Sequence, residues 1–453
     1  MVSYGNVVVV TYDADFSQTQ PTPNPRHLHT VEYILGGGSE NTAQASTVTS
    51  YAGTSWNTTK GTAGTQTVIL EGSNIHVVSA YLDIGYIITT SVSLTDEGVT
   101  IDVGDSSSGG TDTHVGEETS VNPYRGTGPS GYKRRSHDVT ALFDRQTDAA
   151  WSAGVPVVAG VTVGGGARAL TTVKLVITYE SDYSLVAHSE VKTVKFPLSS
   201  LAAGDRGSRG VACAALATCS FAATSTLDTG VSNADILDAH IEMSGEVDSG
   251  TASTFQFGIR GGTASSSAFN WTEAISDQTF PRAIWELPIG AFDFHSGNNV
   301  YTVDAKMGSV AMNALGGVLV VTYRFSTGAA SQTDTVSYFL DQETTAPGTA
   351  RVNMGTTSTQ IANGGLSMKN IWMEVHDAPY AASNITLFGR VSTSSEVSQQ
   401  YTLTSANQRG GQDFTLILDM SDQAGSYFAS ASSTDISGAF QDSARSRSFT
   451  TWC

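Results

Sequence analysis

The feature that most constrains the fold is an internal repeat, in which four sequence patterns recur about three times in one order. The first pattern is a run of β-branched residues that ends in Thr-Tyr, at residues 6–12, 172–179 and 317–323. The second pattern begins with Thr-Val and comes a dozen or more residues later, at residues 30–35, 193–198 and 335–340. Both patterns are spaced alike along the chain, so they mark repeated structural units rather than chance similarity.

The third pattern alternates apolar and polar residues, at residues 78–84, 237–243 and 370–375. Period-two alternation predicts a strand with one face on a core and one face in solvent. Asp83, Glu242 and Glu374 share the polar phase, and His240 is expected to face solvent with Glu242. The fourth pattern lies between two acidic residues, at residues 138–144, 286–293 and 413–419.

Turns rich in Gly, Ser, Asn and Asp separate these patterns, which is typical of antiparallel sandwiches and barrels. We therefore predict an all-β chain of about three tandem antiparallel β-sandwich units, jelly-roll-like, with little helix. The predicted boundaries are an orphan strand in residues 1–16 and units at residues 17–183, 184–327 and 328–453. The third unit has no complete closing strand of its own in this division.

The orphan strand is predicted to be an interface strand, formed by Val7, Val8, Val9, Val10, Thr11 and Tyr12. The Thr-Tyr pattern ends the other units, yet here it opens the chain, and a strand without partners cannot satisfy its backbone polar groups. Three explanations remain open. The strand belongs to a preceding unit of a longer chain, or it folds back to close the third unit, or it is donated to a neighbouring molecule.

Composition excludes several functional classes. The net charge of −19 and the absence of a Lys/Arg cluster argue against nucleic-acid binding. No run of eighteen apolar residues is present, so no membrane insertion is expected. The first residues lack the basic and apolar regions of a signal peptide, and a leader removed from the mature protein stays compatible with the sequence.

The cysteines suggest one disulfide. Cys213 and Cys219 lie six residues apart and are close enough in sequence for a bridge, with two buried free thiols as the alternative. No second Cys/His pair stands nearby, so a zinc site is not expected.

Two stretches carry potential metal ligands. Asp102, Asp105 and Asp112 supply carboxylates of the kind that Ca²⁺ binds, although without the spacing of a calcium loop, and a plain solvated loop is the alternative. His27 and His29, two residues apart, would share one face of a strand and suit a metal. They follow a Pro-rich stretch, however, where exposed polar residues are the default. No cofactor is predicted apart from Ca²⁺.

Two tryptophans are candidates for binding sugars or a partner. Trp56 and Trp271 lie among Ser, Thr and Asn residues and are predicted to be in polar loops, as glycan platforms or interface anchors. The alternative is that each ring packs on its own sandwich.

No motif of nucleophilic, metal-dependent or phosphate-binding catalysis occurs, and we predict that the chain is not an enzyme. The patterns favour a structural subunit of an extracellular, cell-surface or virion-surface assembly, such as a filament, sheath, surface layer or virion. Its partner would be further copies of itself in an oligomer or polymer. The alternative is a carbohydrate-binding or adhesive module of a secreted protein, with glycans as partners.

Overall fold

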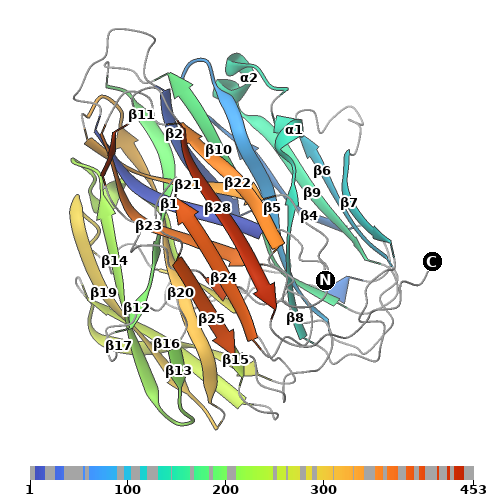
Figure 1. Ribbon diagram of the computed structural model, residues 1–453, viewed down its shortest axis with the longest axis vertical. Coiled ribbons are helices and arrows are strands. Elements are labelled where there is room, and N and C mark those ends of the chain that lie inside the picture. Colours follow the sequence, from blue (N-terminus) through green and yellow to red (C-terminus); the bar gives the residue numbers. More distant parts are fainter. Residues whose placement is uncertain are drawn as a thin grey trace.

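The fold is all-β, with antiparallel sheets and very little helix in the described part of the chain (Figure 1). It is known from a computed structural model. The structure describes residues 6–15, 26–34, 55–56, 61–88, 96–103, 113–119, 131–143, 145–163, 168–182, 187–200, 211–247, 253–261, 264–275, 282–287, 293–309, 311–329, 331–340, 352–360, 365–375, 384–391, 397–402, 416–417, 426–428 and 433–442.

The first sandwich consists of an inner and an outer sheet. The inner sheet has the order β2-β10-β5-β8 and contains β2 (Arg26–Ile34), β10 (Arg168–Asp182), β5 (His76–Ile88) and β8 (Gly131–Asp138). The outer sheet has the order β4-β9-β6-β7 and contains β4 (Gly61–Val68), β9 (Val155–Val163), β6 (Asp96–Val103) and β7 (Thr113–Thr119). The short β3 (Ser55–Trp56) pairs with the start of β10.

The core of this sandwich lies between its two sheets. Leu82, Leu175 and Val157 are fully buried there, and such burial of aliphatic side chains is the main driving force for the packing. Two short helices, α1 (Thr140–Phe143) and α2 (Asp148–Ala153), each add one buried aromatic ring to the same core, Phe143 and Trp151.

The second sandwich repeats this arrangement. Its inner sheet has the order β11-β20-β15-β18 and contains β11 (Ser189–Pro197), β20 (Met312–Ser326), β15 (Ile236–Val247) and β18 (Arg282–Glu286), with β13 (Val211–Cys213) added to β20. Its outer sheet has the order β12-β14-β19-β16-β17 and contains β12 (Ser199–Ser200), β14 (Thr218–Leu227), β19 (Gly297–Met307), β16 (Ser253–Gly261) and β17 (Ala264–Ile275). A 3₁₀ turn, η2 (Asn233–Asp235), precedes β15, and Phe221, Ile241 and Leu319 are among the buried core residues.

The third sandwich takes one strand from the start of the chain. Its inner sheet has the order β21-β1-β23-β26 and contains β21 (Ser331–Leu340), β1 (Asn6–Asp15), β23 (Gly365–Val375) and β26 (Leu416–Ile417), with β27 (Ser426–Phe428) also paired to β23. Its outer sheet has the order β22-β28-β24-β25 and contains β22 (Val352–Gln360), β28 (Ser433–Asp442), β24 (Asn384–Val391) and β25 (Val397–Thr402). Figure 1 shows this outer sheet in front of β1, β21 and β23.

All three sandwiches are jelly rolls with the same strand order. If the eight main strands of each are counted along the repeat, the inner sheet reads 1-8-3-6 and the outer sheet reads 2-7-4-5. In the third sandwich β1 is strand 8, the place that β10 and β20 hold in the other two. The fold class predicted from the repeat is confirmed.

The orphan strand therefore finds its partners in its own chain. Val10 lies opposite Val336 of β21 on one side and Ile371 of β23 on the other. Val7, Val9 and Val10 are buried. Because both edges of β1 are paired, the strand has no free edge for a neighbouring molecule, and the explanation that it closes the third sandwich is the one found here.

Candidate functional site

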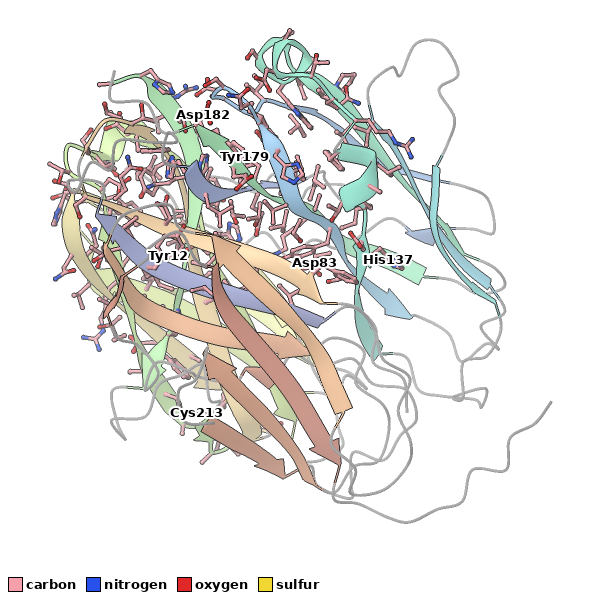
Figure 2. All side chains as sticks on the ribbon, turned by 45° about the horizontal axis from the view of Figure 1, so that its top comes forward. Tyr12, Asp83, His137, Tyr179, Asp182 and Cys213 are labelled. Carbon is pink, nitrogen blue, oxygen red and sulfur yellow. A yellow bond between two sulfur atoms is a disulfide. The ribbon has the colours of Figure 1, made fainter. Side chains whose placement is uncertain are left out.

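The candidate site is the junction at which the three inner sheets meet. The edge strands β2, β11 and β21 come together there, and strand 8 of each inner sheet lies beside its edge strand. The centre of the junction is apolar and contains Val7, Val9, Tyr81, Val176, Val318 and Val320. Figure 2 shows Tyr12 and Tyr179 on the strands that lead into this region.

Threonine pairs hold each edge strand to strand 8. The hydroxyl oxygens are hydrogen bonded in Thr30–Thr178 (2.6 Å), Thr193–Thr322 (2.8 Å) and Thr11–Thr335 (2.8 Å). Each of these pairs comes from the first and second sequence patterns, so the repeat places the same contact in all three inner sheets.

The same hydroxyls bond to the backbone of the next edge strand. Thr11 donates to the carbonyl oxygen of Lys195 (2.7 Å), and Thr178 donates to that of Ser337 (2.8 Å). The Glu32 N–H donates to Thr193 (3.0 Å). Lys195, Ser337 and Glu32 hold equivalent positions in the repeat. The third sandwich therefore contacts the second, the second contacts the first, and the first contacts the third. It satisfies backbone groups that an uncovered sheet edge would leave exposed.

A buried ion-pair network joins the first and second inner sheets. Lys174 of β10 contacts Glu32 of β2 (3.3 Å), Asp83 of β5 (3.4 Å) and, most closely, Glu242 of β15. Lys195 of β11 contacts the other oxygen of Glu32 (2.6 Å). Burial opposes the ionised form of Glu32, but Lys174 and Lys195 outweigh it and lower the pKa of this carboxyl.

The expected orientation of the third-pattern residues is therefore wrong. Asp83, Glu242 and His240 are turned away from the sandwich cores, as the alternation predicts, but they are buried rather than exposed to solvent. The reason is that the outward face of each inner sheet packs against another inner sheet. Alternation reports which residues share a face and contains no information about what covers that face.

His240 is the charged member of this network on β15. Its Nδ1 lies 2.7 Å from Asp238, and its Nε2 lies 3.4 Å from Glu242 and 3.6 Å from Glu32. Burial opposes protonation, but Asp238 and the other two carboxylates outweigh it and raise the pKa of His240 to about 10. The imidazole is therefore a cation at neutral pH.

This raised pKa predicts a loss of stability in alkali. The pKa of His240 in the folded chain lies above the ordinary histidine value of 6.5, so its contribution to stability is complete below pH 6.5 and disappears as the pH rises toward about 10. We expect the free energy of unfolding to fall by a few kcal/mol across this range, since each unit of pKa shift corresponds to about 1.4 kcal/mol.

Urea denaturation at several pH values measures this effect. The variant His240→Gln, whose new side chain does not titrate, should be less stable than the parent chain at pH 6. Between pH 6.5 and 10 its free energy of unfolding should fall much less than that of the parent chain. An equal decline in both proteins would assign the alkaline sensitivity to other groups.

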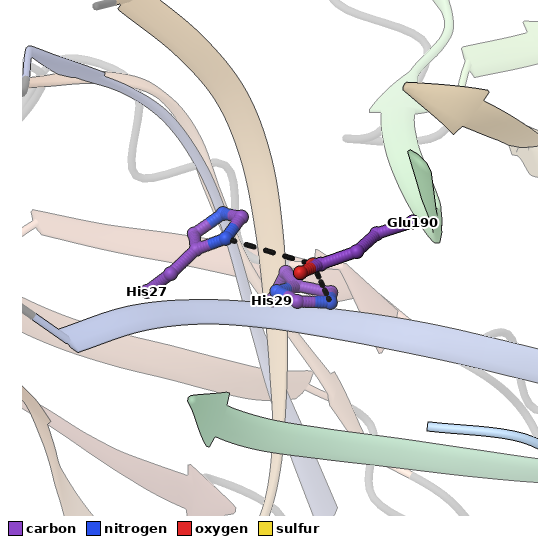
Figure 3. Close-up of side chains that lie close together, drawn as sticks. All are labelled: His27, His29 and Glu190. Atoms are coloured by element: carbon purple, nitrogen blue, oxygen red, sulfur yellow. Dashed lines mark ion pairs between the residues drawn. The ribbon is translucent and has the colours of Figure 1, made fainter. Parts of the chain in front are cut away.

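A second polar cluster lies on β2 and β11. His27 and His29 share one face of β2, and Glu190 of β11 faces both rings, with its Oε2 at 4.0 Å from His27 Nδ1 and 3.7 Å from His29 Nε2 (Figure 3). The expectation that these histidines are exposed is wrong, because β2 already begins at Arg26 and carries both rings into the junction.

Hydrogen bonding fixes the state of this cluster. His29 Nε2 lies 2.6 Å from the hydroxyl of Tyr179. Burial, with a smaller effect of His27, holds the pKa of His29 well below its usual value, so the ring is neutral. Burial also raises the pKa of Glu190.

Two groups in the described residues have the ligand types of a metal site. One is His27, His29 and Glu190, and the other is Glu32, His240 and Glu242. In the second group the ammonium groups of Lys174 and Lys195 already stand against the carboxylates. In the first group the ring nitrogen that faces Glu190 is engaged by Tyr179. We therefore assign both as hydrogen-bonded and ion-paired clusters.

Next to the histidines, Lys192 of β11 lies between two carboxylates. Its Nζ is 2.6 Å from Asp228 and 2.9 Å from Asp334, and it stands 4.0 Å from the centre of the Phe325 ring. His27 Nε2 contacts the far side of Asp334 at 3.2 Å. Neither Lys192 nor the two carboxylates were found from the sequence.

The residues proposed from the sequence lie elsewhere. Trp56 is on β3 and Trp271 is on β17, so the expectation that both are in loops is wrong. Their Ser, Thr and Asn neighbours are as compatible with edge strands as with loops. Asp102 is on β6, while Asp105 and Asp112 lie outside the described residues.

The two cysteines are brought together at the end of the second sandwich away from the junction. Cys213 of β13 and Cys219 of β14 form a disulfide with a Cα–Cα distance of 6.0 Å. Figure 2 shows Cys213 apart from Tyr179 and Asp83.

These features define an all-β protein of three jelly rolls around a buried junction, which has an apolar centre and polar clusters beside it. The chain matches no protein-family model and no curated protein. Solved structures found to resemble the chain include PNGase F, a glycosylasparaginase from Flavobacterium meningosepticum, at 11% identity over 68% of this chain and 99% of the other, with a TM-score of 0.18.

Two other solved structures match to a similar extent. One is the tandem CBM22-1-CBM22-2 domain of Paenibacillus barcinonensis Xyn10C, at 8% identity over 64% of this chain and 98% of the other, with a TM-score of 0.18. The other is infectious bursal disease virus, Gx strain, at 12% identity over 71% of this chain and 77% of the other, with a TM-score of 0.16. The matches thus include a viral structure and carbohydrate-binding modules, and at these scores none transfers a function.

The prediction that the chain is not an enzyme is corrected. It rested on the absence of known sequence motifs, and such an absence does not exclude catalysis. The solved structures that resemble the chain include a glycosylasparaginase, at a TM-score of 0.18. The match supplies no catalytic residue. Among the described residues, no helix is long and apolar enough to cross a membrane.

Proposed function

We propose that this chain is a structural subunit of an extracellular or surface assembly, such as a filament, sheath, surface layer or virion. The observation that carries the proposal is the closed set of three jelly rolls with one strand order, completed by β1. Because the three sandwiches share one strand order, each has an outer sheet of similar topology. Repeated contacts between similar surfaces are the usual basis of ordered homo-assemblies.

The buried junction supports this role. Ion pairs and threonine hydroxyls connect the three inner sheets to one another, so each sandwich is in direct contact with the other two. The outer sheets are then the surfaces through which copies would meet, with interfaces above about 1,000 Å² expected for stable contacts. The disulfide favours an oxidising, extracellular location.

The test is the state of the purified full chain. We expect electron microscopy and sedimentation to show ordered oligomers or polymers that become more abundant with added salt. Salt screens the repulsion between copies that each carry a net charge of −19. Dispersed single particles at all protein and salt concentrations would overturn the proposal.

A carbohydrate-binding module is the second candidate. It is favoured by the position of Trp56 on the short β3 and of Trp271 on β17, which is an edge strand of its sheet. Aromatic residues on strands at the edge of a sheet are a common basis for stacking on sugars. A glycan array that compares the parent chain with the variants Trp56→Ala and Trp271→Ala tests this candidate. Glycan binding that both variants retain would exclude these two residues as the sugar-binding residues.

Calcium binding near Asp102 stays a prediction.

A further inference from the structure

We propose that Lys192 and Asp228 form an intramolecular amide bond, which locks the junction after the three sandwiches have come together. The proposal starts from a contact: Lys192 Nζ lies 2.6 Å from Asp228 Oδ2. Both side chains are buried, with 0% and 3% of the side chain exposed. Lys192 comes from β11 in the inner sheet, while Asp228 directly follows β14 of the outer sheet.

A backbone donor prepares Asp228 for attack. The Thr333 N–H donates a 2.6 Å hydrogen bond to Asp228 Oδ1, the oxygen that does not face Lys192. When an amine adds to the carboxyl carbon, negative charge develops on Oδ1, and a fixed donor at that position stabilises it. The carboxyl is thus held with one oxygen toward an oxyanion donor and the other toward the nucleophile.

Asp334 stands where a catalytic base is needed. Its Oδ1 lies 2.9 Å from Lys192 Nζ, and it is fully buried. Burial opposes its ionised form, but Lys192 and His27 outweigh burial and hold the pKa of Asp334 well below its usual value. Burial raises the pKa of Asp228 instead, so the two carboxyls that share one ammonium differ in their affinity for a proton.

The reaction balances without any further reactant. One proton of the Lys192 ammonium passes to Asp228 Oδ2, which leaves a neutral amine and a neutral acid. The amine nitrogen bonds to the carboxyl carbon of Asp228, and Asp334 carries a second proton from the nitrogen to the Oδ2 hydroxyl. The bond from carbon to Oδ2 breaks and water leaves. The third proton stays on the amide nitrogen.

The surroundings favour the product. A buried ion pair retains a large desolvation cost, and the amide removes both charges from the site. Phe325, whose ring centre is 4.0 Å from Nζ, helps to exclude the water that hydrolysis would need. Thr333 and Asp334 belong to β21 and His27 to β2, so all three inner sheets must be in place before the site is complete.

The ion pairs that Glu32 makes with buried lysines lack this arrangement. The carboxylate oxygens of Glu32 that face Lys174 and Lys195 accept no hydrogen bond from a backbone N–H in the described residues. They offer ion pairing without an oxyanion donor, so Lys195, on the same strand as Lys192, serves as the matched control.

Intact mass spectrometry of the folded full chain, denatured and reduced afterwards, tests the proposal. We expect a mass lower than the sequence mass by one water, and a proteolytic fragment in which Lys192 is joined to Asp228. Lys192→Arg should show the full sequence mass with a folded circular dichroism spectrum, while Lys195→Arg should keep the deficit. Asp334→Asn should form the bond about a hundredfold more slowly, because proton transfer by a placed group contributes at least this factor.

The full sequence mass in the folded parent chain after long incubation at neutral pH would overturn the proposal. A bond from Lys192 to Asp334 would overturn the choice of Asp228. These readouts do not depend on whether the chain assembles, so they are separate from the test of the proposed function.

Discussion

Deletion of residues 1–15 is expected to unfold the third sandwich. The deletion removes strand 8 of its inner sheet, which leaves β21 and β23 without their shared partner. It also removes five buried apolar residues, namely Val7, Val9, Val10, Tyr12 and Ala14. At about 1.5–3 kcal/mol for each large buried side chain, the loss is on the order of 10 kcal/mol, comparable to the whole stability of a typical domain.

Limited proteolysis and circular dichroism measure the result. The truncated chain should be cut rapidly beyond residue 328 and should lose β-sheet signal, whereas a control that lacks only residues 1–4 should behave like the parent chain. A synthetic peptide of residues 1–16 added during refolding should restore protection. Unchanged protection in the truncated chain would contradict the pairing of β1 with β21 and β23.

Replacement of Lys174 by methionine is expected to cost about 3–5 kcal/mol of folding free energy. The methionine is close to lysine in length, so the change removes the charge and leaves the packing volume nearly intact. Three buried carboxylates, Glu32, Asp83 and Glu242, then face one another with less positive charge among them. The cost is the penalty of that uncompensated charge rather than the net value of the ion pairs.

Urea denaturation at neutral pH gives the cost directly. The triple variant Lys174→Met, Asp83→Asn, Glu242→Gln should recover part of the lost stability, because it removes two of the charges that the lysine faced. Lys306→Met, at an exposed position of β19, is the control and should change stability by about 0.5 kcal/mol or less. A loss at Lys174 no larger than the loss at Lys306 would contradict the network.

The repeat was sufficient to predict the jelly rolls but not their closure. The Thr-Tyr ending of β1 identifies it as strand 8 of a unit. The same pattern is compatible with a preceding unit, with the third unit of this chain and with a neighbouring molecule as the place of that strand. Periodicity describes neighbours along one strand, while pairing with β21 depends on a contact across more than three hundred residues. The sequence contains no local signal for such a contact.

The junction was missed for a related reason. Asp83 and Glu242 were placed on the correct face of their strands, and nothing in the alternation indicates that another sheet covers this face. A usable signal was present in the lysines. Lys174, Lys192 and Lys195 lie in strands that contain several β-branched residues, in a chain with few lysines. A charged residue in such a strand is expected to have a buried counter-ion.

The position of β1 also determines the order of events during synthesis. The ribosome makes this strand long before its partners β21 and β23, which are complete only after residue 375. The first two jelly rolls have all their strands by residue 326 and can fold while the chain is still being extended. The third jelly roll cannot form until β21 and β23 are made, and the apolar strand β1 stays unpaired until then. Its high contact order predicts that this jelly roll folds last and most slowly.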